Sequence, residues 1–142
     1  MSATGINHVS VHAADLDASE AFYREFFGVL RIPAPHFEHP VRWLKVGQAQ
    51  LHLFNRAADA PANHHFALTV DDLEEVYRKA QAKGVLDRPE VRRLPDGSAQ
   101  MYLRDPSGNL VECNAPDADA LDTAVVGELV PVGGEEGARL FL

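Results

Sequence analysis

The sequence predicts an α+β fold built from two tandem βαβββ modules, residues 5–55 and 64–114. The segment 65–73 repeats the residue pattern of 8–16 at a distance of 57 residues. Each copy then runs from an acidic residue into a helical pattern that ends at a glycine. Residues 99–114 consist of two alternating runs around a turn sequence. Such internal repetition indicates a duplicated supersecondary unit.

The first module opens with a predicted strand over 6–12, in which apolar and polar residues alternate. A helix is expected over 17–27, because Asp15 or Asp17 can cap its start and Gly28 can end it. Three further strands complete this module, over residues 29–35, 41–46 and 50–54.

The second module follows a linker over 55–63, which is small, polar and contains Pro61. Its first strand begins at His65. Asp71, with Glu74 three residues later, predicts a capping box at the start of the second helix. That helix is expected to end at Gly84, and a short strand over residues 91–94 follows.

The hairpin over 99–114 completes the second module. Pro106 fits the second position of a type I turn and Gly108 fits the fourth. Alternate side chains of a strand share a face, so Glu112 lies on one face of its strand between apolar neighbours. A buried carboxylate needs a cation or hydrogen-bond donors.

Composition excludes several functional classes. The 142 residues are 46% hydrophobic and 24% charged, with a net charge of −8. The extension 115–142 supplies −5 of that charge, and Ala124–Val132 within it can add a strand or meet another subunit. No basic stripe indicates nucleic-acid binding. No apolar run approaches the roughly 20 residues of a membrane span.

The sequence also gives expectations for the cellular compartment of the protein and its redox environment. The first residues lack the charged and apolar regions of a signal peptide. Cys113 is the only cysteine, which excludes an internal disulfide and fits a reducing compartment. A cytoplasmic protein is therefore expected.

Alignment of the two copies identifies a candidate metal site. His8 and His65 stand at equivalent places on the first strands, and His52 and Glu112 on the last strands. Two sheets related by pseudo-twofold symmetry would bring these four positions around one cavity. Two imidazoles and a carboxylate suit a divalent transition metal and leave coordination positions open. The other histidines lack this support and are expected to face solvent or lie outside the site: His12, His36, His39 and His64.

The chain resembles the vicinal oxygen chelate superfamily, which includes glyoxalase I, methylmalonyl-CoA epimerase, fosfomycin-resistance transferases and type I extradiol dioxygenases. The resemblance covers residues 5–114 and lies in GINHVSV, HFALTVDDL and YLRDPSGNLVE. It implies two βαβββ modules around a divalent metal held by His8, His65 and Glu112. Because related small proteins often complete their sites across subunits, a homodimer is also implied.

The position of His52 separates members of the superfamily. The resemblance places a glutamate ligand there in glyoxalase I and a glutamine in the epimerase. A histidine there, with Tyr102 ten residues before Glu112, is similar to the dioxygenases, in which these residues act as acid/base and substrate partner. Against this, Arg92-Arg93-Leu94-Pro95 occupies the region where the dioxygenase signature has a further histidine. The chain is also much shorter than usual dioxygenases, and fosfomycin transferases share the tyrosine spacing.

The expected function is Fe(II)-dependent extradiol cleavage of a catechol-like small molecule, with His52 and Tyr102 as catalytic residues. Manganese, zinc or nickel are alternatives to iron. The open alternatives are a glyoxalase- or epimerase-type isomerase or lyase, a fosfomycin-type transferase, and a metal-free drug-sequestering protein. His52 can equally be a fourth metal ligand, and Tyr102 can simply line the pocket wall. For Phe37 and Trp43, ordinary core packing is favoured over a role in an aromatic pocket.

Overall fold

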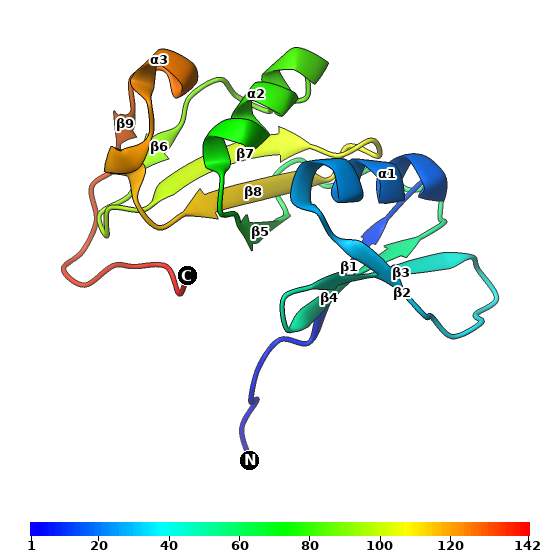
Figure 1. Cartoon of the computed structure of the whole chain (residues 1–142). Helices are drawn as coiled ribbons and strands as arrows, with labels where there is room; N and C mark the ends of the chain where they lie inside the picture. Colours follow the sequence, from blue (N-terminus) through cyan, green and yellow to red (C-terminus); the bar gives the residue numbers. More distant parts are fainter. The chain divides into compact units, whose positions relative to one another are not determined.

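The computed structural model describes residues 1–142, which divide into two compact units. The first unit contains residues 1–62 and the turn 105–109. The second unit contains residues 63–104 and 110–142. Both units show the predicted order of one strand, one helix and three strands (Figure 1). The predicted α+β fold of two βαβββ modules is therefore confirmed.

The first unit is a four-stranded sheet covered by one helix. Parallel pairing joins its first and last strands, which gives the order β1-β4-β3-β2. Asp15 caps the helix by accepting a hydrogen bond from the Ala18 backbone N–H, and Gly28 ends it at φ 62°. The elements are β1 (His8–His12), α1 (Leu16–Phe27), β2 (Leu30–Ile32), β3 (Val41–Val46) and β4 (Ala49–Phe54).

The second unit repeats this arrangement and adds a fifth strand, in the order β5-β8-β7-β6-β9. Its repeat elements are β5 (His65–Thr69), α2 (Leu73–Lys83), β6 (Arg92–Arg93), β7 (Ala99–Arg104) and β8 (Leu110–Ala115). The extension contributes η1 (Ala118–Ala120), α3 (Thr123–Val126) and β9 (Val130–Pro131). Because β9 pairs in parallel with β6, the extension adds a strand, which was one of the two roles expected for it.

The predicted capping box of the second helix is wrong by one residue. Asp72, not Asp71, caps α2 by accepting a 2.8 Å hydrogen bond from the Glu75 backbone N–H. Glu74 has other partners: its carboxylate accepts from the Asp122 backbone N–H at 2.7 Å and lies 3.4 Å from Arg78. Two adjacent aspartates satisfy the sequence rule, Asp71 with Glu74 and Asp72 with Glu75, and the structure has Asp72 as the cap.

Strand register confirms the equivalence of the two copies. In the first unit His8 lies opposite Gln50, so His52 lies two residues beyond that pair. In the second unit His65 lies opposite Leu110, so Glu112 holds the same place. The buried side chains of α1 and α2 are apolar or tyrosine, except for Ser19 on α1, and burying each large apolar one contributes roughly 2 kcal/mol.

The turn between β7 and β8 is organised by a buried carboxylate. As predicted, the Gly108 backbone N–H bonds the Asp105 carbonyl and closes the turn. Asp105, only 5% exposed, accepts hydrogen bonds from the Tyr23 hydroxyl at 2.7 Å and from the Asn109 side chain at 2.8 Å. It also accepts from the backbone N–H groups of Ser107 and Asn109. Asn109 in turn donates to the His12 carbonyl.

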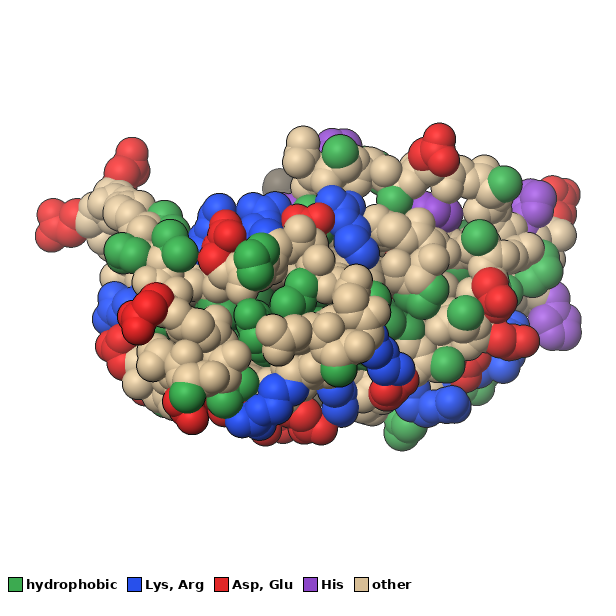
Figure 2. All heavy atoms as spheres, turned by 90° about the horizontal axis from the view of Figure 1, so that it is seen from above, with side chains coloured by type: hydrophobic (Ala, Val, Ile, Leu, Met, Phe, Trp, Pro, Cys, Tyr) green, Lys and Arg blue, Asp and Glu red, His purple; other side chains and the backbone are tan.

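Surface charges of both signs stand beside one another over the face drawn in Figure 2. Several form ion pairs, such as Arg42 with Glu20 at 3.0 Å and Arg93 with Asp119 at 2.9 Å. None of the helices combines the length and the apolar character needed to cross a membrane.

Candidate functional site

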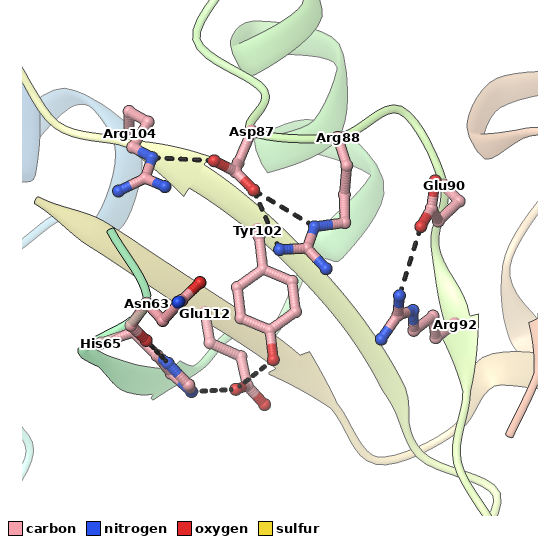
Figure 3. Close-up of polar contacts among 9 residues, drawn as sticks. All are labelled: Asn63, His65, Asp87, Arg88, Glu90, Arg92, Tyr102, Arg104 and Glu112. Atoms are coloured by element: carbon pink, nitrogen blue, oxygen red, sulfur yellow. Dashed lines mark hydrogen bonds and ion pairs between the residues drawn. The ribbon is translucent and has the colours of Figure 1, made fainter. Parts of the chain in front are cut away.

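The second unit brings together three predicted site residues, His65, Tyr102 and Glu112. They come from β5, β7 and β8, and Tyr102 lies directly opposite Glu112 in the antiparallel register. The His65 imidazole and the Tyr102 hydroxyl meet at the Glu112 carboxylate (Figure 3). Both contacts, from His65 Nε2 and from the Tyr102 hydroxyl, are 2.9 Å long and end on Glu112 Oε2.

The orientation of the His65 ring is set by its own loop. Nδ1 lies 2.9 Å from the carbonyl oxygen of Asn63, and a carbonyl can only accept, so Nδ1 carries a hydrogen. Nε2 is therefore the ring atom that faces Glu112. Histidines that bind metals commonly donate their other ring N–H in this way.

Glu112 is held as a carboxylate inside the sheet. It is 5% exposed, and burial raises its pKa. Hydrogen bonds from Gln100, Asn114 and Tyr102, together with the nearby His65, outweigh burial and bring the pKa below its ordinary value. Glu112 is thus an anion in a site that can stabilise a bound cation.

Tyr102 remains protonated at physiological pH. Burial, followed by its hydrogen bond to Glu112, raises its pKa to about 12. The Arg88 guanidinium lies over its ring at 4.6 Å from the ring centre, and Asp87 holds that guanidinium at 3.0 Å (Figure 3). The phenol group is therefore a fixed hydrogen-bond donor.

The first unit holds the other two predicted residues, His8 and His52, in a ring stack. The centres of the His8 and His52 rings are 4.3 Å apart with planes at 16°. Trp43 stacks on His52 at 4.1 Å with planes at 2°. The side-chain oxygen of Asn7 contacts His8 Nδ1. In His8, as in His65, Nδ1 is therefore engaged by a neighbouring oxygen, and Nε2 is the ring nitrogen on the other side.

His52 differs from His8 and His65 in which nitrogen is engaged. Its Nε2 lies 2.8 Å from the side-chain oxygen of Gln50, two residues earlier on β4. His52 is 5% exposed. Burial, and secondly the neighbouring His8, lower its pKa below 6.5. It is therefore neutral at pH 7.

The lowered pKa of His52 predicts a pH-dependent contribution to stability. The unfolded chain takes up the proton more readily than the folded chain, so the free energy of unfolding should fall as the pH drops below 6.5. Urea unfolding measures this change. Between pH 7.5 and 5.5, the free energy of unfolding should decrease less for His52→Gln than for the unmodified chain. An equal decrease in both would contradict the assignment.

A cavity of about 500 Å³ lies beside this stack in the first unit. Neither carboxylates nor lysine or arginine side chains line it. Its wall consists of Asn7, His8, Phe37, Trp43, Gln48, Gln50, His52 and Phe54. Phe37 is 53% exposed. The expectation of ordinary core packing for Phe37 and Trp43 is therefore wrong, because Phe37 in the loop before β3 and Trp43 on β3 both line this cavity.

The remaining histidines lie away from the candidate site residues or at the surface. His36, His39 and His64 are exposed and His12 is half-buried. No group of three or more His, Cys, Asp or Glu side chains in residues 1–142 stands together as a metal cluster. Sequence reasoning missed the neighbours that orient the site: Asn7, Gln50, Arg88, Gln100 and Asn114. A residue two positions from a candidate ligand lies on the same face of its strand. This rule would have indicated Gln50 and Asn114.

A comparison with protein families decides the identification. Residues 5–113 match the model of the Glyoxalase/Bleomycin resistance protein/Dioxygenase superfamily. The chain belongs to this superfamily. The resemblance to vicinal oxygen chelate proteins is thereby confirmed, and the match ends one residue before the 5–114 expected for it.

Several proteins and solved structures are similar to this chain. An uncharacterized protein of Pseudomonas aeruginosa is 37% identical over 123 residues, covering 75% of this chain and 85% of that protein. A lactoylglutathione lyase from Agrobacterium tumefaciens is 28% identical with a TM-score of 0.62, covering 85% of this chain and all of that one. A fosfomycin resistance protein from Listeria monocytogenes, complexed with Mn(II) and a dihydroxypropylphosphonic acid, shares the fold with a TM-score of 0.70. That protein is 18% identical, and the match covers 83% of this chain and 96% of that one.

Proposed function

We propose that this chain is a metal-dependent enzyme in which His8, His65 and Glu112 hold a divalent ion. Its proposed reaction is the Fe(II)-dependent extradiol cleavage of a catechol-like small molecule in a homodimer. Such an ion would supply positions at which two vicinal oxygens of a substrate and O₂ react.

The atoms of the second unit fit a metal ion. His65 Nε2 and Glu112 Oε2 are 2.9 Å apart. The two atoms are close enough together that one divalent ion could be held by both of them. His8 supplies the third ligand as the repeat equivalent of His65, with its Nδ1 likewise engaged. The Mn(II) complex of the Listeria protein supports a divalent ion in this family.

The contact between His52 and Gln50 is the observation that carries the assignment of His52 as acid/base. Its Nε2 is engaged at 2.8 Å, whereas Nε2 of His8 and His65 is the atom left for a metal. A neutral buried imidazole can take a proton from a substrate hydroxyl and return it to the ring-opened product. Gln50 keeps the ring oriented while this happens.

Tyr102 has a narrower role than the sequence predicted. Its hydrogen is directed to Glu112, and its raised pKa keeps that hydrogen in place. The phenol oxygen can still accept a hydrogen bond from a substrate hydroxyl. We therefore retain Tyr102 as a substrate partner, acting as acceptor while it donates to Glu112.

The cavity in the first unit supports an aromatic substrate. Phe37 and Trp43 offer ring surfaces, and the remaining lining groups are neutral amides, imidazoles and a further phenyl ring. A phosphonate substrate of the fosfomycin type would require cations at its anionic group. The absence of lysine and arginine from this lining favours a planar, uncharged ring.

Oxygen uptake tests the reaction. The chain is reconstituted with Fe(II) without air and then given O₂ and a panel of catechols. We expect uptake with at least one catechol, and a loss of kcat of about 10²–10⁴-fold in His52→Gln at unchanged iron affinity. Glu38→Gln, an exposed substitution, serves as the control.

The rival is a metal-assisted isomerase or lyase, which the 28% identity to a lactoylglutathione lyase favours. In that reaction His52 is a fourth ligand and no oxygen is consumed. If no catechol provokes uptake while His52→Gln lowers metal affinity, the rival replaces the dioxygenase. Metal-free protein that binds an aromatic drug tightly would instead indicate sequestration.

A further inference from the structure

The two oxygens of the Glu112 carboxylate have different partners. Oε1 accepts hydrogen bonds from two side-chain amides, Gln100 Nε2 at 2.8 Å and Asn114 Nδ2 at 2.9 Å. Oε2 faces the His65 imidazole and the Tyr102 hydroxyl, both at 2.9 Å. The two amides therefore contact Oε1, whereas His65, the predicted metal ligand, contacts Oε2.

Strand register produces this division. Gln100 lies opposite Asn114, and Tyr102 lies opposite Glu112, on the antiparallel pair β7 and β8. Alternate side chains share a face, so all four residues are on one face of the sheet. The neighbours Val111 and Cys113 on β8, both fully buried, point to the opposite face.

We propose that Gln100 and Asn114 are positioning residues that occupy Oε1 and present Glu112 to a metal through Oε2 alone. This inference rests on the metal-binding role proposed for Glu112. A free carboxylate can bind a cation through one or both oxygens. Two amide donors on Oε1 fix the plane of the Glu112 carboxylate. They therefore favour binding of the metal through Oε2 alone.

The two amides differ in how firmly they are held. Asn114 is 1% exposed, and its Nδ2 also donates to the Ala99 carbonyl at 3.3 Å. Gln100 is half-buried, and its contact with Glu112 is the one hydrogen bond seen for its side chain. Replacing Gln100 therefore removes a donor from Oε1 with little effect on the rest of the sheet.

Gln100→Met tests the proposal, since methionine keeps the length of glutamine and lacks the amide. Gln81→Met, on an exposed position of α2, is the matched control. Calorimetry with Mn(II) should show a 10–100-fold loss of affinity in Gln100→Met and none in the control. The infrared splitting of the metal-bound carboxylate should narrow in Gln100→Met, because Oε1 then keeps only the Asn114 donor and can approach the metal more closely.

Crystal structures of the metal-free chains give a second measurement. The Glu112 carboxylate should keep one orientation in the unmodified chain and rotate in Gln100→Met. Unchanged affinity and splitting, or an unchanged carboxylate orientation, would overturn the positioning role. If the unmodified chain bound no metal, the proposed enzyme would fail, while the carboxylate orientation would still decide whether Gln100 positions Glu112.

Discussion

Replacing His65 with alanine is expected to abolish stoichiometric metal binding. His65 Nε2 is the ring atom that faces Glu112 Oε2, and the Asn63 carbonyl fixes the ring by accepting from Nδ1. Loss of this imidazole removes one of three proposed ligands. Affinity for a divalent ion should therefore fall by more than about 100-fold, a larger effect than loss of an outer hydrogen-bond partner.

The adjacent His64 provides the matched control for this experiment, because it is an exposed histidine one residue away. Elemental analysis after purification should find about one ion per chain in the unmodified protein and in His64→Ala, and almost none in His65→Ala. Calorimetry with Mn(II) measures the change in affinity. Stoichiometric metal retained by His65→Ala would remove His65 from the ligand set.

Asp105→Ala is expected to lower the free energy of unfolding by about 3–5 kcal/mol, the upper end of single-substitution effects. The carboxylate of Asp105 is buried and accepts from the Tyr23 hydroxyl, the Asn109 side chain and two backbone N–H groups of the turn. Alanine leaves all these donors without their acceptor, and unsatisfied buried donors cost about 1–3 kcal/mol each before relaxation.

Urea unfolding followed by circular dichroism measures this loss. Asp59→Ala, an exposed substitution in the same unit, should change the free energy of unfolding by less than about 0.5 kcal/mol. Asp105→Asn keeps one acceptor oxygen. Its loss of free energy of unfolding should therefore lie between those of Asp105→Ala and Asp59→Ala. A loss below about 1 kcal/mol in Asp105→Ala would show that the turn does not depend on this carboxylate.

The fold was predictable because its signals are local and occur twice. Alternating apolar residues give the strands, and Asp15 and Gly28 cap and end α1. Errors arose where two adjacent residues satisfy the same rule, as with Asp71 and Asp72 at the start of α2. Core packing was wrongly favoured over a pocket position for Phe37, because residue type alone does not separate a core ring from one beside a cavity.

The candidate site was predictable only in part. The equivalence of His8 with His65, and of His52 with Glu112, follows from counting along the repeat, and strand register bears it out. Spacing of two residues along one strand would have indicated Gln50 beside His52 and Asn114 beside Glu112. Gln100 was not predictable, because it reaches Glu112 from the neighbouring strand β7 through its side-chain orientation.

By itself, the sequence determined that this chain is a duplicated βαβββ protein with four candidate site positions at equivalent places. Those features depend on periodicity and interval, which are properties of the linear chain. Only the tertiary structure decided which ring nitrogen of each histidine a neighbouring group engages, and which oxygen of Glu112 accepts from the amides. These depend on hydrogen bonds between neighbouring strands and loops, which exist only once the sheets have formed.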